Sequence, residues 1–306
     1  MRRAETGASP AAKMHRMGPT PLGIRLALAA LAVGVVVGCG SSTPGHTVRT
    51  VAGSGGTRSW NEYRPPGLPV GPVPLVVVLH GLGETPTAIA RTTGIDALAR
   101  RDGFVVAYPA GVGKSWDAGT CCGVAAARHT DDVDFIAGVV ANLVGSGRVD
   151  ARRVFVLGFS NGAMMAWDLA CERPGLVAGV AEVEGTLTGS CPVHRPRDLL
   201  VVHQRDDAVI PFGGTPTPDV RLGDTAALPP VETGLARWLG GERCTTPPAV
   251  VPSTLVQPFE RDTYDCPGPS RTELVLLDGG THVWPRLPDS AVDGAALVTA
   301  FFGLAR

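Results

Sequence analysis

A serine lies at the centre of Gly158-Phe159-Ser160-Asn161-Gly162, a pentapeptide that fits the G-x-S-x-G nucleophile elbow. The apolar run at 154–157 is typical of a buried strand, and the residues at 163–170 favour a helix. A strand–turn–helix lifts the serine hydroxyl clear of the sheet, and the two glycines let backbone segments approach closely. This context favours Ser160 as a nucleophile over the alternative, an ordinary strand-to-helix turn.

A serine hydroxyl attacks well only when a base takes its proton, and that base is usually a histidine oriented by a carboxylate. His282 is the favoured base because it lies in the loop directly after the apolar run 272–277, the last predicted strand. In chain order the acid is expected between the serine and the histidine. Asp206 and Asp207 both follow a strand predicted at 199–203, so position alone leaves the choice between them open.

An oxyanion needs backbone N–H donors close to the nucleophile. Asn161, the residue after the serine, is expected to supply one donor, and the loop after an earlier strand is expected to supply the other. The segment 79–83, Leu-His-Gly-Leu-Gly, fits that loop, with the N–H of Leu82 as the candidate donor. We expect His80, in the same segment, to be structural and to bond its own loop.

Strand and helix signals alternate along the chain, and the elements that they predict must position these residues. Alternation predicts an α/β fold with a mostly parallel sheet, helices on both faces, and ligands at the carboxyl ends of the strands. The Pro-rich segment 212–230 is expected to form a loop over the site. Besides the elbow, the expected strands are 58–63, 73–79, 104–108, 176–183, 199–203 and 272–277, and the expected helices are 87–101, 131–143, 231–239 and 290–304.

The N-terminal region has the features of an export signal. Residues 1–38 carry basic residues and then an apolar stretch that is short for a membrane span, as in a bacterial lipoprotein signal peptide. Cys39 is the expected lipidated residue and membrane anchor; the alternative is a plain signal peptide that contains a cysteine. Residues 39–56 are expected to be a flexible tether and 57–306 the catalytic domain, in an extracytoplasmic location.

Composition sets further limits. The 306 residues, 44% of them hydrophobic, are enough for one large α/β domain or two small ones, and a net charge of −1 gives no reason to expect a nucleic-acid partner. Six cysteines remain after Cys39, and an even number outside the cytoplasm suggests disulfides. Cys244 with Cys266 is the preferred pair because both flank one loop-rich segment. There is no C-x-x-C motif or histidine cluster, so neither a metal nor a cofactor is expected.

Taken together, these segments resemble the polyhydroxybutyrate depolymerase-like branch of the α/β-hydrolases, which overlaps the feruloyl and acetylxylan esterases of carbohydrate esterase family 1. The resemblance covers roughly residues 46 to 303. The Cys-Cys-Gly and Ser-Asn-Gly-Ala-Met-Met segments make it much more specific than the bare elbow. The matching motifs are Leu-His-Gly at 79–81, Tyr-Pro-Ala-Gly at 108–111, Trp-Asp-Ala-Gly-Thr-Cys-Cys-Gly at 116–123, Asp-Asp-Val-Asp-Phe at 131–135, the elbow at 158–165 and Gly-Gly-Thr-His-Val-Trp-Pro at 279–285.

The family's usual His-Gly-Thr-x-Asp aligns with His-Gln-Arg-Asp-Asp at 203–207, so the resemblance implies Asp207 as the acid, after an altered loop. It also implies an exported serine esterase that acts through an acyl-enzyme on short hydroxyacyl, feruloyl or acetyl-sugar esters. Trp116 and Trp284 are expected either to wall the substrate site or simply to pack near it. The alternatives are a serine peptidase of the prolyl-oligopeptidase type and an inactive binding lipoprotein on the same scaffold.

Overall fold

The computed structural model describes residues 45–306, with gaps at 54–55, 192–196, 225 and 251–258. The expected signal peptide and Cys39 therefore lie outside the described residues. Within the described part, no helix combines the length and the apolar character that crossing a bilayer requires.

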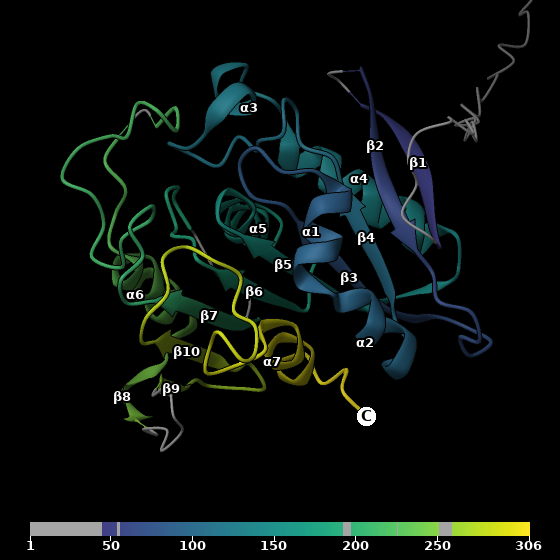
Figure 1. Cartoon of the computed structure of the whole chain (residues 1–306). Coiled ribbons are helices and arrows are strands. Elements are labelled where there is room, and N and C mark those ends of the chain that lie inside the picture. Colours follow the sequence, from purple (N-terminus) through teal and green to yellow (C-terminus); the bar gives the residue numbers. More distant parts are fainter. Residues whose placement is uncertain (1–44, 54–55, 192–196, 225, 251–258) are drawn as a thin grey trace, which may run out of the picture. The chain divides into compact units, whose positions relative to one another are not determined.

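One sheet of ten strands organises the described chain, in the order β1-β2-β4-β3-β5-β6-β7-β10-β9-β8 (Figure 1). The strands from β4 to β10 in this order run parallel, and antiparallel pairs flank them at both edges. The mostly parallel sheet predicted from the sequence is confirmed. The strands are β1 (His46–Gly53), β2 (Gly56–Tyr63), β3 (Val73–Leu79), β4 (Val105–Pro109), β5 (Val149–Phe159), β6 (Gly179–Val183), β7 (Asp198–Gln204), β8 (Thr245–Val250), β9 (Phe259–Asp265) and β10 (Thr272–Leu277).

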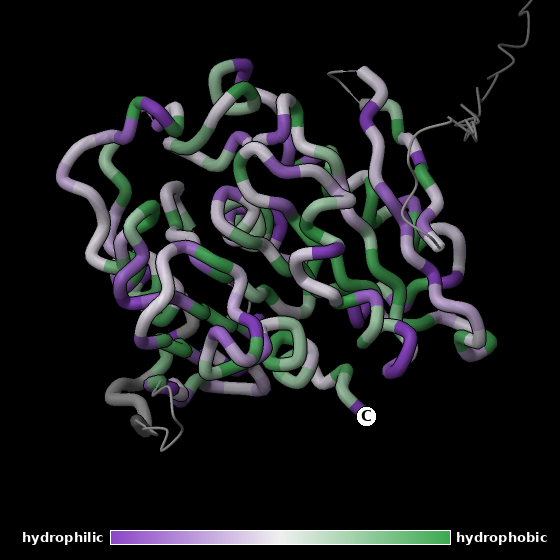
Figure 2. The backbone as a smooth tube through the Cα atoms, viewed as in Figure 1, coloured by the Kyte–Doolittle hydropathy of each residue, from purple (hydrophilic) through white to green (hydrophobic). Residues whose placement is uncertain are grey.

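Helices cover both faces of this sheet, as expected. On one face lie α4 (Asp132–Gly145), α5 (Asn161–Glu172) and α6 (Val231–Glu242), and on the other lie α1 (Pro86–Thr93), α2 (Ile95–Asp102) and α7 (Gly294–Phe301). Alternate residues of β3 divide between the two cores: Leu75 and Val77 pack with the first group, and Val76 and Val78 with the second. Strand β3 is accordingly buried and apolar along its length (Figure 2).

Two expected elements differ in the structure. Residues 46–53, predicted as the end of a tether, form β1 and pair with β2; the β-branched Thr47, Val48, Thr50 and Val51 suit an extended chain, and Val51 packs on the core. The helix predicted at 87–101 is two helices, because Gly94 adopts a left-handed conformation (φ 63°) and its N–H caps α1 on the carbonyl of Ala90. The edge strands β8 and β9 are further additions within a segment expected to be loop-rich.

The parallel arrangement gathers five loops at one edge of the sheet. These five follow the carboxyl ends of β3, β4, β5, β7 and β10 and contain the motifs that the sequence analysis singled out, and the segment after β6 reaches the same side of the sheet. The short helix α3 (Gly123–Ala127) lies in the loop after β4.

Candidate active site

Ser160 occupies the turn between β5 and α5. Its backbone (φ 57°, ψ −125°) lies in a region that residues other than glycine rarely adopt. Both flanking glycines are required by close backbone packing: a Cβ on Gly158 would lie 2.1 Å from the carbonyl oxygen of Gly162. A Cβ on Gly162 would lie 2.3 Å from the carbonyl oxygen of Leu79 at the end of β3. The elbow expected from the sequence is therefore present and sterically fixed.

Three of the expected residues form one row of hydrogen bonds. The Oγ of Ser160 lies 2.8 Å from Nε2 of His282, and Nδ1 of His282 lies 2.7 Å from Oδ2 of Asp207. The other oxygen of Asp207, Oδ1, accepts the backbone N–H groups of Val209 (2.7 Å) and Ile210 (2.9 Å). With its neighbours holding both oxygens, the carboxylate can orient the imidazole so that Nε2 faces the serine hydroxyl.

The charge state of Asp207 suits that arrangement. Burial by itself would raise the pKa of Asp207, but hydrogen bonds with His282 and Glu184 and the attraction of His282 outweigh it and lower the pKa to about 2. Asp207 is therefore ionised at neutral pH. Asp206, which position in the sequence left as a rival, is exposed to solvent.

The loop that carries His282 is fixed by the residues that depart from the family pattern. The side-chain amide of Gln204 donates to the carbonyl of Val283 (3.1 Å) and accepts its N–H (3.2 Å). A Cβ on Gly280 would lie 2.5 Å from Cδ of Gln204, so the glycine makes room for this amide. Arg205 forms ion pairs with Asp278 and with Glu260 of β9. The altered loop thus ties β7 to the histidine loop.

The two expected oxyanion donors also lie at this edge. Asn161 is the first residue of α5, and a helix leaves the N–H of its first residue without an intrahelical acceptor. The N–H of Gly81 donates to Glu84 and that of Gly83 to the carbonyl of Lys114, whereas the N–H of Leu82 between them donates to no group in the described residues. Leu82 and Asn161 line the same cavity as Ser160.

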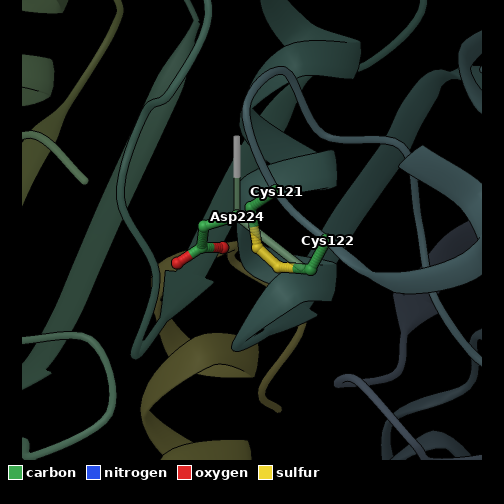
Figure 3. A group of neighbouring side chains, drawn as sticks. All are labelled: Cys121, Cys122 and Asp224. Carbon is green, nitrogen blue, oxygen red and sulfur yellow. A yellow bond between two sulfur atoms is a disulfide. The ribbon is translucent and has the colours of Figure 1, made fainter. Parts of the chain in front are cut away.

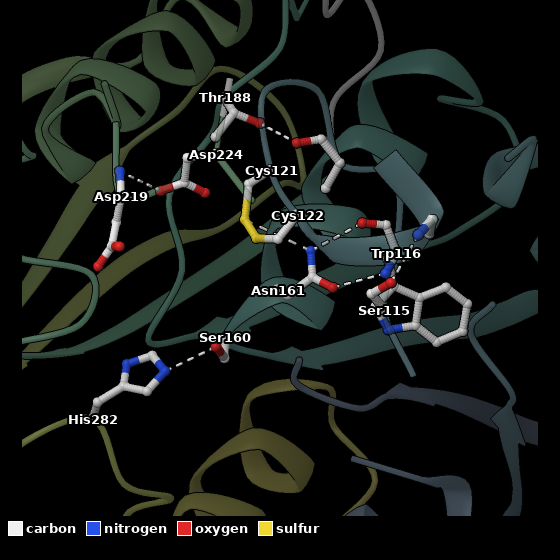
Figure 4. The surroundings of a disulfide bond; sticks show 12 residues. Ser115, Trp116, Cys121, Cys122, Ser160, Asn161, Thr188, Asp219, Asp224 and His282 are labelled. Atoms are coloured by element: carbon white, nitrogen blue, oxygen red, sulfur yellow. Dashed lines mark hydrogen bonds between the residues drawn. A yellow bond between two sulfur atoms is a disulfide. The ribbon is translucent and has the colours of Figure 1, made fainter. Parts of the chain in front are cut away.

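The side chain of Asn161 holds the loop after β4 against the elbow (Figure 4). Its Oδ1 accepts the N–H of Trp116 (2.8 Å), and its Nδ2 donates to the carbonyl of Trp116 (3.1 Å). The indole N–H of Trp116 donates to the carbonyl of His80 (2.8 Å). His80 bonds the carbonyl of Gly81 through Nδ1 and accepts the N–H of Gly111 through Nε2, so it is structural, as expected.

Three disulfides join the cysteines of the described part: Cys121–Cys122, Cys171–Cys191 and Cys244–Cys266. The last is the pair preferred from the sequence. Cys121 and Cys122 line the cavity beside Ser160, and an oxygen of the buried Asp224 lies within 4.8 Å of both sulfur atoms (Figure 3). Because the two sulfurs are bonded to each other, this group offers no thiolate to a metal.

A cavity of about 150 Å³ adjoins Ser160 and His282. The loop at 212–230 contributes Leu222 and Leu228 to its wall, so this segment lies beside the site as expected. Trp116 and Trp284 do not line this cavity; Trp116 is fully buried against His80, and Trp284 packs edge-on against Phe159. In this structure both indoles pack beside the cavity, and their contact with a substrate stays a prediction. The remaining wall is made by Leu82, Met164, Val209, Ile210, Asn161 and the disulfide.

Sequence reasoning missed two buried glutamates next to the acid. Glu182 and Glu184 are fully buried at the end of β6. Burial raises the pKa of each well above its ordinary value, and Asp207 raises both further. The available signal was a pair of glutamates, one inside and one directly after an apolar strand that parallel pairing buries on both faces.

Comparisons with known proteins place the chain among esterases. The family described as Esterase PHB depolymerase matches residues 58–210. A relative named as an esterase, NocK of Nocardia uniformis subsp. tsuyamanensis, is 33% identical over 258 residues, which are 78% of this chain and 74% of that protein. Feruloyl esterase B of Piromyces equi is 24% identical over 220 residues, which are 68% of this chain and 39% of that protein. The chain thus spans well under half the length of the second relative.

Among solved structures, the acetyl xylan esterase from Aspergillus awamori superposes with a TM-score of 0.62 and 18% sequence identity. The superposition covers 85% of this chain and all of that one. At this identity the likeness concerns the fold, which is that of the α/β-hydrolases.

Proposed function

The chain belongs to the Esterase PHB depolymerase family, and we propose that it is an exported serine esterase that cleaves carboxylic esters through an acyl-enzyme. The row of hydrogen bonds from Ser160 through His282 to Asp207 is the observation that carries this proposal. It combines a nucleophile, a base in reach of its proton, and an ionised acid that orients the base.

The reaction follows from these positions. Nε2 of His282 takes the proton of Ser160 as Oγ attacks the ester carbonyl, and Asp207 stabilises the imidazolium that forms. The N–H groups of Leu82 and Asn161 stabilise the oxyanion. The intermediate collapses when His282 returns the proton to the departing alcohol, which leaves an acyl group on Ser160. Water, activated by the same histidine, then releases the acid and restores the serine.

The size and lining of the cavity support a short aliphatic acyl group over a feruloyl group. Pockets for drug-sized ligands span roughly 300–1,000 Å³, and the cavity beside Ser160 has about 150 Å³. Its lining is mostly aliphatic, with the Cys121–Cys122 disulfide at one side, and the aromatic ring among the described lining residues is the imidazole of His282. We therefore propose acetyl, butyryl or hydroxybutyryl esters as substrates.

Hydrolysis of p-nitrophenyl acetate by the wild type and by Ser160→Ala tests the proposed reaction. Removal of the nucleophile should lower kcat by about 10⁴-fold or more. Ser190→Ala, at an exposed serine, serves as the matched control and should retain full activity. A wild type without esterase activity, or a Ser160→Ala variant as active as the wild type, would contradict the proposal.

Acyl specificity needs its own measurement. We expect kcat/KM to be higher for acetate and butyrate esters than for methyl ferulate. Leu222 is half-buried in the cavity wall, so Leu222→Ala should widen the cavity and raise the preference for longer acyl chains without disturbing the core. Equal kcat/KM values for ferulate and butyrate esters in the wild type would contradict the acyl-size proposal and leave the esterase proposal standing.

We further propose that Cys39 carries a lipid anchor that holds the enzyme at the outer side of a membrane. The three disulfides support export, because structural disulfides persist in oxidising compartments. Expression of the whole chain and of Cys39→Ser in a bacterial host, followed by fractionation, tests the anchor. The wild type should be found with the membranes and the variant should not; equal distribution would contradict lipidation.

A further inference from the structure

Glu184 lies directly against the acid–base pair and is fully buried. Its Oε2 accepts the N–H of Gln204 (3.1 Å). One of its oxygens also lies within 4.8 Å of a carboxylate oxygen of Asp207 and a ring nitrogen of His282. The proposed mechanism does not use Glu184, although its carboxyl group lies within 4.8 Å of that of the acid, Asp207.

The backbone at Glu184 is unusual for this residue type. Its φ is 56°, in the left-handed region, and the following residue is Gly185. A non-glycine residue in this region is strained, and such strain persists mainly where the surrounding structure and function require the side chain. The backbone N–H of Glu184 donates to the carbonyl of Val202, which holds the strained residue next to β7.

The groups that face Glu184 decide its charge. Glu182 of β6 is fully buried as well, and Asp207 is ionised. His203 of β7 lies 3.8 Å from Glu184 and 3.7 Å from Asp207, but its Nε2 bonds the carbonyl of Ile210 and burial lowers its pKa. His203 is therefore neutral, and His282 is the remaining group that can carry a positive charge.

Glu184 must then be uncharged at neutral pH. Burial, the hydrogen bond with Asp207 and the negative charge of Asp207 together raise the pKa of Glu184 well above its ordinary value. A protonated carboxyl group has an O–H to donate, whereas two ionised carboxylates in contact would repel each other without a cation between them.

We propose that Glu184 is a positioning residue whose protonated carboxyl donates a hydrogen bond to the Asp207 carboxylate and keeps it aligned on Nδ1 of His282. The bond also draws negative charge away from the side of Asp207 that faces the imidazole. Without it, Asp207 would hold the imidazolium more strongly, and His282 would act as a base only at higher pH. The effect on catalysis rests on the proposed esterase function. The shared proton, which is bound to Glu184 and donated to Asp207, does not depend on that function.

Two variants at this position separate the hydrogen bond from the volume of the side chain. Glu184→Gln keeps a donor for Asp207 and an acceptor for Gln204, whereas Glu184→Met fills a similar volume without either. We expect Glu184→Met to lower kcat by about tenfold or more with little change in KM, and to move the acid limb of the kcat/KM profile to higher pH by about half a unit. Glu184→Gln should stay within about threefold of the wild type with the acid limb in place. Glu182→Gln, at the equally buried neighbour, should leave both quantities as in the wild type.

An infrared difference spectrum tests the proton without turnover. Wild type minus Glu184→Gln at pH 7 should show the band of a protonated carboxyl group. Carboxylate bands in its place would overturn the proposal, even if Glu184→Met does not fold. Equal acid limbs in the wild type and Glu184→Met, or an equal loss in Glu184→Gln and Glu184→Met, would also overturn it. A wild type that shows the protonated band and hydrolyses no ester would instead refute the esterase function and leave the shared proton standing.

Discussion

The nucleophile side and the acid–base side of the candidate site are held by different kinds of contact. On the nucleophile side, Gly158 and Gly162 allow backbone segments of β3, β5 and α5 to touch, and no larger residue fits there. On the acid–base side, side chains do the positioning: Gln204 clamps the His282 loop, and Glu184 contacts Asp207. The nucleophile side is fixed by backbone contacts that leave no room for a Cβ, and the acid–base side is fixed by hydrogen bonds between side chains and loops.

This difference predicts how each side responds to substitution. Backbone contacts cannot relax around an added atom, so errors on the nucleophile side should damage the fold itself. Polar clamps contribute on the order of 1 kcal/mol each, so errors on the acid–base side should reduce catalysis and leave the fold standing.

The largest expected effect comes from Gly162→Val. Because a Cβ at this position would lie 2.3 Å from the carbonyl oxygen of Leu79, we expect a loss of more than about 4 kcal/mol in the free energy of unfolding, or no folded protein. Gly145→Ala is the control, since a Cβ there meets nothing within 4 Å and should leave stability equal or slightly higher. Denaturant unfolding measures both. A stable Gly162→Val would show that the elbow can relax.

A pH-dependent effect of intermediate size distinguishes two carboxyl groups, Asp168 on the elbow helix and Asp207. Burial, with repulsion from Glu172 and Asp117, raises the pKa of Asp168 to about 7. Between about pH 4 and pH 7 the unfolded chain ionises this group while the folded chain does not, so stability from this group falls as pH rises through that window. Asp207 has the opposite sign: its stabilisation is present above about pH 4 and is lost as pH falls towards about 2.

Replacing Asp168 should therefore stabilise the protein at neutral pH. We expect Asp168→Asn to raise the free energy of unfolding at pH 7 by roughly 1–3 kcal/mol and to make no such difference at pH 4. Asp289→Asn, at an exposed aspartate, is the control and should show no difference at either pH. Denaturant titrations at the two pH values measure this, and an equal change at both would contradict the assigned titration.

Gln204→Ala tests the acid–base side directly. Loss of two hydrogen bonds to Val283 should loosen the His282 loop and lower kcat/KM by about tenfold, with a loss of about 2 kcal/mol in the free energy of unfolding, well below the loss expected for Gly162→Val. Ester hydrolysis and thermal unfolding are measured together. If Gln204→Ala keeps the activity of the wild type, backbone contacts fix the histidine loop as they fix the elbow. The proposed difference between the two sides would then be wrong.

The same contrast explains what the sequence could predict. The elbow is local: the residues that shape it lie within five positions, next to a strand and a helix that have clear patterns of their own. The sheet, the pairing of Cys244 with Cys266 and the loop of Leu82 also follow from local signals. The clamp of Gln204 on Val283 joins residues 79 positions apart, and its amide stands where the family pattern has glycine, so alignment alone indicated only an altered loop.

Tertiary packing decided the points that the sequence left open or placed differently. An indole near an active-site motif can belong to the core or line the substrate site. Trp116 is buried in the core, where its indole N–H donates to the carbonyl of His80. Residues 46–53, expected to belong to a tether, form a strand because the β-branched residues at 47–51 could pair with β2. Glu184 escaped notice because its role depends on a neighbour from another strand.

The smallest expected effect belongs to Arg205, which also lies on the acid–base side but at the surface. Its side chain is 44% exposed, and its ion pairs with Asp278 (2.9 Å) and Glu260 (2.7 Å) are open to solvent. We expect Arg205→Ala to lower kcat/KM by less than about threefold and stability by less than about 1 kcal/mol, with the difference shrinking at high salt. Arg152→Ala removes the ion pair of a more exposed arginine near the start of β5, at the other end of that strand from Ser160, and should have no effect on hydrolysis. If Arg205→Ala instead lowered kcat/KM as much as Gln204→Ala, an ion pair open to water would hold the His282 loop as firmly as the buried amide. Closeness to His282 would then decide the size of the effect more than burial does.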